Sequence, residues 1–157
     1  MDRSVQLGFG PHLTLDLYGC NHRKMSDSSF ITGVLEELPD LIGMTKISEP
    51  YVSQYNGKKD SFDKGGISSF IFIAESHIAI HTFAAQNFAS VDIFSCKQFD
   101  VQLAEEYLAG AFEAKKVEKN LFDRGKEFPK QVELAKPIMA EDRKTISSIE
   151  AKKFRRR

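Results

Sequence analysis

The sequence of 157 residues has no tryptophan, only two cysteines and no net charge at pH 7. Cys20 and Cys96 form no C-x-x-C pair, so neither a zinc site nor a disulfide framework is predicted. No apolar run approaches the roughly 18 residues of a membrane-spanning helix, and the first residues lack the charged-then-apolar pattern of a signal peptide. We therefore expect a cytoplasmic protein with no membrane partner and no metal, in which either cysteine is available as a working thiol.

The neutral total conceals an uneven distribution of charge. The last 15 residues contain seven Lys or Arg against one acid, so this segment carries +6 and the rest of the chain −6. An acidic body argues against a nucleic-acid-binding domain, and a basic chain end is most often a solvated terminus. We predict a single domain over residues 1–128, a charged C-terminal extension over 129–157, and no nucleic-acid partner.

Several common catalytic signatures are absent. The sequence has no G-x-S-x-G elbow, which argues against an α/β-hydrolase. It has neither a Walker A motif nor a G-x-G-x-x-G loop, so a nucleotide-phosphate site lacks support. His77 and His81 would lie about 13 Å apart on a strand, at roughly 3.3 Å per residue, which is too far for one metal ion.

What the sequence does contain is a regular succession of strand and helix patterns. Period-two alternation and β-rich composition predict strands, whereas apolar residues at 3.6-residue spacing after cap residues predict helices. We predict strands at 12–20, 45–56 (broken near Pro50), 68–74, 77–83, 89–96 and 117–122, and helices at 26–38 (closed by Pro39), from Asp100 to Phe112, and briefly after Asp142. This order is typical of an α+β domain with helices on one face of a mainly antiparallel sheet.

Polar residues interrupt the most apolar segment of the chain, "FIFIAESHIAIHTF". Glu75 and Ser76 stand between two strand patterns, and His77 and His81 then share one strand face. Taken one by one, such residues are most often structural, because a histidine on a strand is usually satisfied by a hydrogen bond. A buried or half-buried cysteine is also usually inert. The residues alone leave the structural and the catalytic interpretations open.

A wider pattern resembles the bacterial and archaeal S-adenosylmethionine decarboxylase proenzymes. The family's hallmark is a G-x-S strand leading to E-S-H, then a histidine five residues after that serine and a cysteine fifteen further on. The run "GGISSFIFIAESHIAIHTF…ASVDIFSC" has this spacing, with the four positions at Ser68, Ser76, His81 and Cys96. "GPHLTLDLYGC" resembles the family's opening strand, so the resemblance covers about residues 7–125.

The resemblance implies that the chain cuts itself between Glu75 and Ser76. In the family, the serine hydroxyl attacks the preceding carbonyl to form an ester, and β-elimination then splits the chain, here into 1–75 and 76–157. The second subunit begins with a covalently bound pyruvoyl group derived from Ser76. This group forms a Schiff base with the substrate amine and accepts the electrons released with CO₂, a task that pyridoxal phosphate performs elsewhere.

The resemblance also implies roles for the remaining residues. His81, helped by the Ser68 hydroxyl, removes the α-proton during the elimination, and Cys96 returns a proton to the substrate carbon after CO₂ leaves. Phe62 stacks on the adenine of S-adenosylmethionine, and Asp16 is the carboxylate beside the substrate. Without the resemblance, Phe62 is an ordinary loop aromatic and Asp16 a solvent-facing strand residue. Two protomers are expected to pair into a homodimer, an α/β/β/α sandwich with the sheets inside.

One position departs from the family pattern and leaves the identity of the substrate undecided. Most members read T-W-P-E after the histidine, whereas this chain reads T-F-A-A. The glutamate that accepts hydrogen bonds from the ribose is replaced by Ala85, and the loss of a charged acceptor costs roughly 1.5–3 kcal/mol. Gln86 points to the opposite face unless the chain turns there. We predict an S-adenosylmethionine decarboxylase that supplies aminopropyl groups for spermidine synthesis; the alternatives are an arginine or ornithine decarboxylase and an uncleaved, non-catalytic partner subunit.

Overall fold

The computed structural model describes residues 9–126 and 128. Along the chain the elements are β1 (Gly10–Tyr18), α1 (His22–Met25), α2 (Ser28–Leu41), β2 (Tyr51–Tyr55), β3 (Gly66–Ile73), β4 (Ser76–Phe83), the 3-10 helix η1 (Ala84–Gln86), β5 (Phe88–Ser95), α3 (Val101–Phe112) and β6 (Lys116–Arg124). The predicted strands and the two longer predicted helices are confirmed, except that the strand predicted over 45–56 is present only from Tyr51 to Tyr55. Helices α1 and η1 were not predicted. The extension predicted over 129–157 and the short helix after Asp142 lie outside the described residues.

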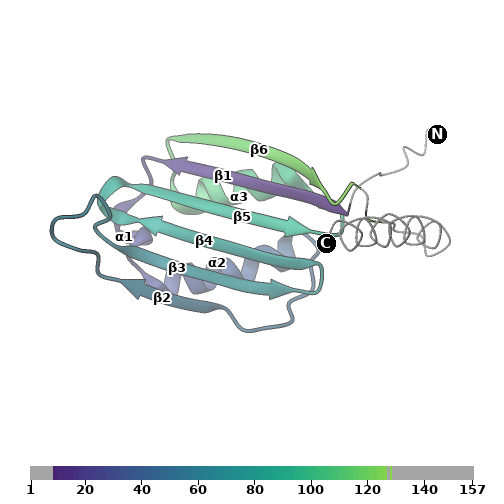
Figure 1. Ribbon diagram of the computed structural model, residues 1–157, viewed down its shortest axis with the longest axis horizontal. Helices are drawn as coiled ribbons and strands as arrows, with labels where there is room; N and C mark the ends of the chain where they lie inside the picture. Colours follow the sequence, from purple (N-terminus) through teal and green to yellow (C-terminus); the bar gives the residue numbers. More distant parts are fainter. Residues whose placement is uncertain (1–8, 127, 129–157) are drawn as a thin grey trace, which may run out of the picture. The chain divides into compact units, whose positions relative to one another are not determined.

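The strands form one six-stranded sheet in the order β2-β3-β4-β5-β1-β6. Every neighbouring pair is antiparallel. Figure 1 shows α2 and α3 lying on the same face of this sheet, with no described helix over the other face. The sheet and its helices form one compact unit, Gly10–Arg124. The predicted α+β architecture with helices on one face is therefore confirmed.

Strand alternation separates the two faces of the sheet. Because successive side chains point to opposite faces, one set of residues packs under the helices and the other set stays on the face without helices, here called the open face. The largest fully buried side chains are Phe112, Leu13, Leu15, Leu17, Met25, Ile31, Leu35, Leu38, Ile67, Ile71, Ile73 and Ile78. Burial of this apolar set against α2 and α3 fixes which strand residues remain on the open face.

The helix ends show which cap predictions were right. Asp100 accepts a hydrogen bond from the Leu103 N–H at the start of α3, as predicted. Asp27 caps α2 by accepting from Ser29 and Phe30 N–H groups. The prediction that Pro39 closes this helix is wrong, because α2 continues to Leu41. Proline removes one helical N–H, but Pro39 is buried in the last turn, where packing against the core holds the backbone in helical form.

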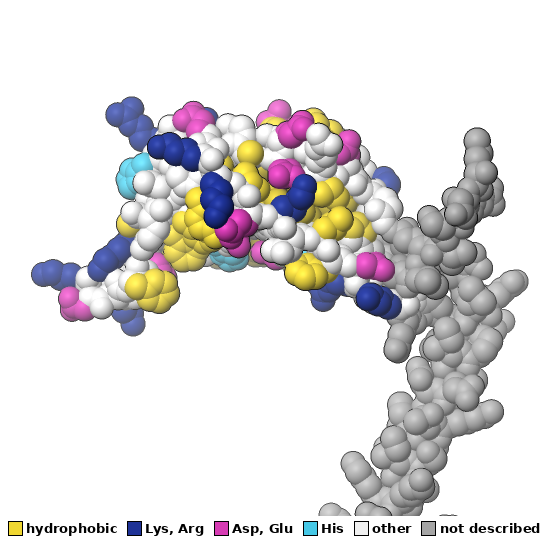
Figure 2. All heavy atoms as spheres, turned by 90° about the horizontal axis from the view of Figure 1, so that it is seen from above, with side chains coloured by type: hydrophobic (Ala, Val, Ile, Leu, Met, Phe, Trp, Pro, Cys, Tyr) yellow, Lys and Arg dark blue, Asp and Glu magenta, His cyan; other side chains and the backbone are white. Residues whose placement is uncertain are grey.

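The outermost strands β2 and β6 leave one backbone edge each without a strand partner among the described residues. Figure 2 looks onto the β6 edge and shows Lys or Arg side chains interspersed with Asp or Glu and hydrophobic ones. Lys116 forms an ion pair with Glu118 along this strand, at 2.6 Å. Mixed charges on an edge strand discourage pairing with a further strand. In the part of the chain that the structure describes, no helix is long and apolar enough to cross a membrane.

Candidate active site

The turn between β3 and β4 carries the predicted cleavage point. Ala74 and Glu75 form the turn, and Ser76 opens β4 opposite Ile73. Ser76 has φ of 154°, a positive value that residues other than glycine rarely adopt. Its Oγ lies 3.3 Å from His77 Nδ1, although consecutive strand residues normally point to opposite faces. The altered backbone at Ser76 thus brings its hydroxyl beside the next side chain.

Glu75 is held through both its backbone and its side chain. Its carbonyl oxygen accepts a hydrogen bond from the Cys96 N–H at 2.9 Å, and its Oε2 accepts from the Thr45 N–H at 3.1 Å. The Ala74 N–H donates to the Thr45 carbonyl at 2.8 Å. The carbonyl of the Glu75–Ser76 peptide therefore faces a fixed N–H donor, an arrangement that stabilises negative charge on that oxygen.

Cys96 follows β5 and is positioned by its neighbours. The buried Ser95 hydroxyl donates to the Lys97 carbonyl at 2.7 Å and accepts from the Lys97 N–H at 2.9 Å, which fixes the turn around Cys96. Gly10 of β1 lies so close that a Cβ there would stand 1.8 Å from the Ser95 carbonyl oxygen. The predicted proton donor is therefore held next to Glu75 by tight backbone packing.

The two cysteines have different surroundings. Cys20 is 4% exposed and its Sγ donates to the Leu17 carbonyl. Burial raises the pKa of the Cys20 thiol, which keeps it protonated and unreactive. Cys96 is half-buried. Of the two thiols that the sequence left open, Cys96 alone lies beside the predicted cleavage point.

The other predicted processing pair lies on the open face, towards the end of the sheet away from the β3–β4 turn. His81 Nδ1 is 3.0 Å from Ser68 Oγ, and the two residues are opposite each other on β4 and β3. Ser90 on β5 is next in the same row, and Asp16 on β1 follows it. His81 is five residues along β4 from Ser76, about 16 Å at the rise of an extended strand. Within one chain, His81 is not beside the Ser76 hydroxyl.

Phe62 lies in the loop that connects β2 to β3, at the opposite end of the sheet from the β3–β4 turn (Figure 1). Its side chain is 86% exposed. Its carbonyl accepts a hydrogen bond from Gln86 Nε2 at 2.7 Å. The predicted substrate residues Phe62 and Asp16 thus lie towards the Ser68–His81 end of the sheet, away from Ser76 of the same chain.

The chain turns at the position where the family's glutamate is missing. Ala84 to Gln86 form η1, so Gln86 does not point to the opposite strand face and its side chain reaches the Phe62 loop. Ala85 lines a cavity of about 250 Å³ together with His22 and Lys64. No Asp or Glu is among the described residues that line this cavity. The sequence did not predict this turn, because its pattern was interpreted as a possible continuation of the strand that ends at Phe83.

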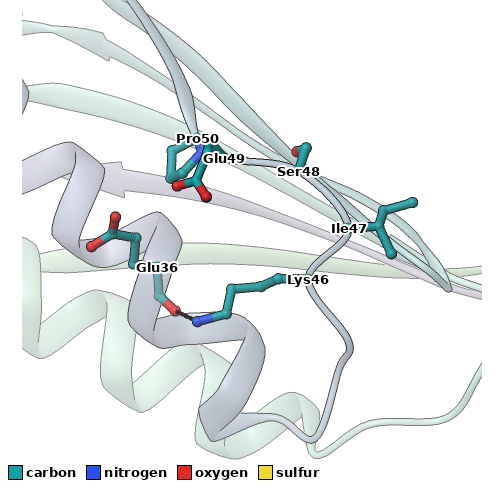
Figure 3. Close-up of a pocket in the computed structure, with 6 residues that line it drawn as sticks. All are labelled: Glu36, Lys46, Ile47, Ser48, Glu49 and Pro50. Carbon is teal, nitrogen blue, oxygen red and sulfur yellow. Dashed lines mark hydrogen bonds between the residues drawn. The ribbon is translucent and has the colours of Figure 1, made fainter.

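A larger cavity of about 580 Å³ lies between α2 and the segment before β2 (Figure 3). Lys46 crosses to α2, where its Nζ donates to the Glu36 carbonyl at 2.9 Å and to Asp40 Oδ2 at 2.7 Å. None of the predicted site residues lines this cavity. Among the described residues, no group of three or more His, Cys, Asp or Glu side chains could hold a metal ion.

His77 is the site residue whose position the sequence did not reveal. The sequence placed it on the His81 face but gave it no role, whereas in the structure its ring contacts the Ser76 hydroxyl. Burial lowers the pKa of His77 below its ordinary value of 6.5, and the nearby His12 and Arg124 lower it further, while Asp92 opposes them. The E-S-H motif was the available signal, but it does not say that the serine turns towards the histidine.

Comparison with known proteins relates the chain to one family. The family model described as "S-adenosylmethionine decarboxylase" matches residues 11–125. The S-adenosylmethionine decarboxylase proenzyme of Clostridium botulinum (strain Loch Maree / Type A3) is 32% identical over 118 residues, 74% of this chain and 95% of the relative. The proenzyme of Thermodesulfovibrio yellowstonii is 33% identical over 107 residues, 68% of this chain and 73% of the relative. The crystal structure of the adenosylmethionine decarboxylase from Aquifex aeolicus VF5 has a TM-score of 0.64 at 28% identity, covering 79% of this chain and 98% of that one.

Proposed function

The chain belongs to the S-adenosylmethionine decarboxylase family, and from this premise we propose that it is a self-processing, pyruvoyl-dependent S-adenosylmethionine decarboxylase. Its product would supply aminopropyl groups for spermidine synthesis. The observation that carries the proposal is the arrangement at the Glu75–Ser76 peptide. The Cys96 N–H donates to the carbonyl of this peptide at 2.9 Å, and Ser76 itself has a positive φ.

The self-cleavage is a rearrangement within this peptide. Ser76 Oγ forms a bond to the Glu75 carbonyl carbon, and the C–N bond breaks to give an ester. The Ser76 α-proton is then removed and the Cβ–Oγ bond breaks, so that Glu75 keeps the carboxylate and ends subunit 1–75. Water replaces the nitrogen of residue 76, ammonia leaves, and subunit 76–157 begins with the pyruvoyl group.

Two features of the turn support the first of these steps. The Cys96 N–H faces the carbonyl oxygen that becomes negative during the attack. A donor already fixed in place stabilises this charge in the transition state and so lowers the activation barrier. The unusual φ of Ser76 stores backbone strain of about 1–3 kcal/mol, which is released when the peptide bond is broken. The junction is therefore destabilised where the cut is proposed.

The residues present fit the pyruvoyl group at position 76. When formed, this group supplies a ketone that binds the substrate amine and accepts the electrons left by CO₂. Cys96 follows directly on the strand residue opposite Ser76, since Ser95 and Ser76 are paired in the sheet. We propose that the Cys96 thiol gives a proton to the substrate carbon after CO₂ leaves.

The proposed roles of Ser68 and His81 require a second copy of the chain. These two residues are hydrogen-bonded to each other, but His81 is about 16 Å along the strand from Ser76 of the same chain. A homodimer that packs open face against open face, with the helices outside, would bring the pair of one protomer to the Ser76 end of the other. His81, oriented by Ser68, would then remove the Ser76 α-proton during the elimination.

The proposed substrate site depends on the same pairing of two protomers. Phe62 is exposed and free to stack on an adenine ring, and Gln86 ties its loop to the turn that carries Ala85. Asp16 lies in the same row as His81 and supplies a carboxylate for the substrate's cationic centre. An arginine or ornithine decarboxylase is the second candidate, because the cavity at Ala85 has no acidic lining residue to bind a ribose.

Two measurements test the proposal. A denaturing gel and an intact-mass spectrum of the purified protein should show two chains divided between Glu75 and Ser76, the second with a nitrogen-free first residue. Ser76→Ala should remain a single full-length chain. CO₂ release from S-adenosylmethionine, arginine and ornithine, measured in parallel, should be fastest with the first. An uncleaved wild-type chain would mean a non-catalytic subunit instead.

The setting of this activity follows from the proposal. We place the enzyme in the cytoplasm, where its substrate is a free small molecule, and expect neither a nucleic-acid nor a membrane partner. Fractionation of cells that produce the tagged chain tests this location, because decarboxylase activity should be recovered in the cytosolic fraction.

A further inference from the structure

His77 is the side chain that contacts the nucleophile of the proposed cleavage, yet the scheme above gives it no task. Its Nδ1 lies 3.3 Å from Ser76 Oγ. His81, to which the elimination is assigned, is hydrogen-bonded to Ser68 and is about 16 Å away along β4. The two histidines therefore lie at different sites. The first step of cleavage needs a base beside the Ser76 hydroxyl, and His77 is the only described histidine at that position.

We propose that His77 is a catalytic residue of self-cleavage, the general base that starts the attack of Ser76 on Glu75. The inference rests on the proposed function and deepens it by dividing the cleavage between two histidines. His77 would act in the first step, from amide to ester, and His81 of the second copy in the elimination.

In the first step, all bonds and protons are exchanged among Glu75, Ser76 and His77. The Ser76 Oγ–H proton passes to His77 Nδ1 as the oxygen bonds to the Glu75 carbonyl carbon. The carbonyl oxygen becomes negative while it accepts the hydrogen bond from the Cys96 N–H. The C–N bond then breaks, and His77 returns the proton to the Ser76 nitrogen. The products are an ester and a free amine, with no other reactant consumed.

The surroundings of His77 suit a base that must be neutral. Its ring packs against Phe94, with centroids 5.9 Å apart, and the Arg124 guanidinium lies 4.2 Å over the same Phe94 ring. Burial lowers the pKa of His77, and His12 and Arg124 act in the same direction, while Asp92 opposes them. At neutral pH the imidazole is therefore unprotonated and able to accept the serine proton at Nδ1.

The neighbouring histidine does not compete for this task. Arginine only donates, so the contact of Arg124 with His12 Nδ1 at 3.4 Å makes that nitrogen the acceptor. His12 Nε2 then carries the hydrogen and donates it to Asp92 Oδ1, 3.0 Å away. Both ring nitrogens of His12 are engaged, which leaves His77 as the base beside Ser76.

Neutral hydroxylamine separates the two steps, because it cleaves an ester between Glu75 and Ser76 but leaves the peptide bond between them intact. His77→Ala should yield a full-length chain that hydroxylamine does not cut between Glu75 and Ser76, with self-cleavage slowed by about 10²-fold or more. His81→Ala should also yield a full-length chain, but hydroxylamine should cut it between Glu75 and Ser76. The released C-terminal piece would then start with an intact serine, which a mass spectrum distinguishes from a pyruvoyl group.

Two further variants control for folding and for size. In His77→Gly, added imidazole should restore cleavage, since a free base can occupy the space of the missing ring. His77→Gln keeps a polar side chain of similar length but accepts no proton, so it should behave as His77→Ala does. Gln102→Ala, on α3 and outside both the turn and the cavity at Ala85, should cleave as the wild type does.

The outcomes distinguish this inference from the proposed function. Wild-type cleavage together with normal cleavage of His77→Ala would overturn the role of His77 and leave the decarboxylase intact. A His77→Ala chain that hydroxylamine cuts as efficiently as His81→Ala would equally overturn it, because the ester would have formed without His77. An uncleaved wild-type chain would instead remove the proposed function itself.

Discussion

Two groups of polar residues, one at each end of the sheet, differ in what surrounds them. The group at the β3–β4 turn, called here the turn group, consists of Glu75, Ser76, His77 and Cys96, linked through backbone and side-chain contacts. The group towards the other end of the sheet, called here the row group, consists of Ser68, His81, Ser90 and Asp16, which face one another in register across four strands.

The difference between the groups lies in how each is fixed. The turn group depends on unusual backbone, with a positive φ at Ser76 and a carbonyl aimed at an N–H donor. The row group depends on ordinary strand register, which repeats wherever antiparallel strands pair. The peptide bond proposed to be cut thus occupies the irregular part of the molecule, and the residues proposed to act on it from a second copy occupy the regular part.

The largest expected effect tests whether the two groups meet across a dimer. The His81→Ala chain should remain uncleaved alone, and so should the Ser76→Ala chain. When the two are produced together, each mixed dimer should contain one complete site, with Ser76 from one chain and His81 from the other. The His81→Ala chain should then be cut, which an affinity tag on it and a denaturing gel would reveal.

The same experiment has a clear opposite result. If His81 served Ser76 of its own chain, neither variant would have a complete site, and the mixture would stay uncut. Exchange between subunits is confirmed by recovery of the untagged chain with the tagged one. A fully uncut mixture of demonstrated heterodimers would therefore exclude the dimeric site.

A smaller but still large effect is expected at Cys96. Cys96→Ala keeps the backbone N–H that faces the Glu75 carbonyl, so self-cleavage should proceed. It removes the thiol proposed to protonate the substrate carbon, so kcat should fall by about 10²- to 10⁴-fold. Steady-state CO₂ release and a denaturing gel on the same sample measure the two effects.

Cys20→Ala is the matched control for this variant. Cys20 is buried and its thiol contacts a backbone carbonyl under the sheet, so its loss should lower the free energy of unfolding by about 1 kcal/mol and leave kcat unchanged. A cleavage defect in Cys96→Ala as large as its turnover defect would contradict the separate roles of N–H and thiol.

The pH dependence of ester formation sharpens the assignment of His77. A base is active when unprotonated, that is, above its pKa. Because burial, His12 and Arg124 hold the pKa of His77 below 6.5 against the opposing effect of Asp92, the rate should be constant from about pH 8 to about pH 7. Below that pKa it should fall about tenfold per pH unit.

This profile is measured in the His81→Ala chain, where hydroxylamine cuts only the ester and His81 no longer contributes. The fraction cut is followed with time after synthesis at each pH. A midpoint above 6.5 would point to a different base and would contradict the assignment of His77.

The sequence predicts the regular parts of this molecule better than the irregular ones. Alternation of Leu13, Leu15 and Leu17 is enough to predict β1, because strand side chains repeat every two residues. The prediction for Pro39 was wrong because the sequence shows a residue that destabilises a helix, but does not show the burial of its side chain that offsets this cost. Tertiary packing decided the end of α2.

The candidate site divides in the same way. The family resemblance links Ser68 with His81, and the structure places the two side chains in contact at 3.0 Å. The contact of His77 with Ser76 depends on a backbone torsion that no residue pattern encodes. The N–H of Cys96 could not be predicted either, because a backbone donor leaves no side-chain signal.

The smallest expected effect concerns the row group's end of the sheet, where Ala85 replaces a glutamate. Ala85→Glu restores a charged acceptor beside the Phe62 loop, and hydrogen bonds to a charged group contribute roughly 1.5–3 kcal/mol. If the substrate is S-adenosylmethionine, its KM should fall by about tenfold or more, whereas KM values for arginine and ornithine should not change in parallel. Initial rates of CO₂ release with each substrate measure this.

Ala84→Glu is the control, because Ala84 lines the same cavity one residue earlier in η1, where a carboxylate would point elsewhere. It should leave KM for S-adenosylmethionine within about twofold, since only a correctly placed acceptor gains the energy of a charged hydrogen bond. An equal fall in KM for both variants would indicate a general effect of negative charge on a cationic substrate. A fall in KM limited to arginine or ornithine would indicate that the site binds an amino acid without a nucleoside.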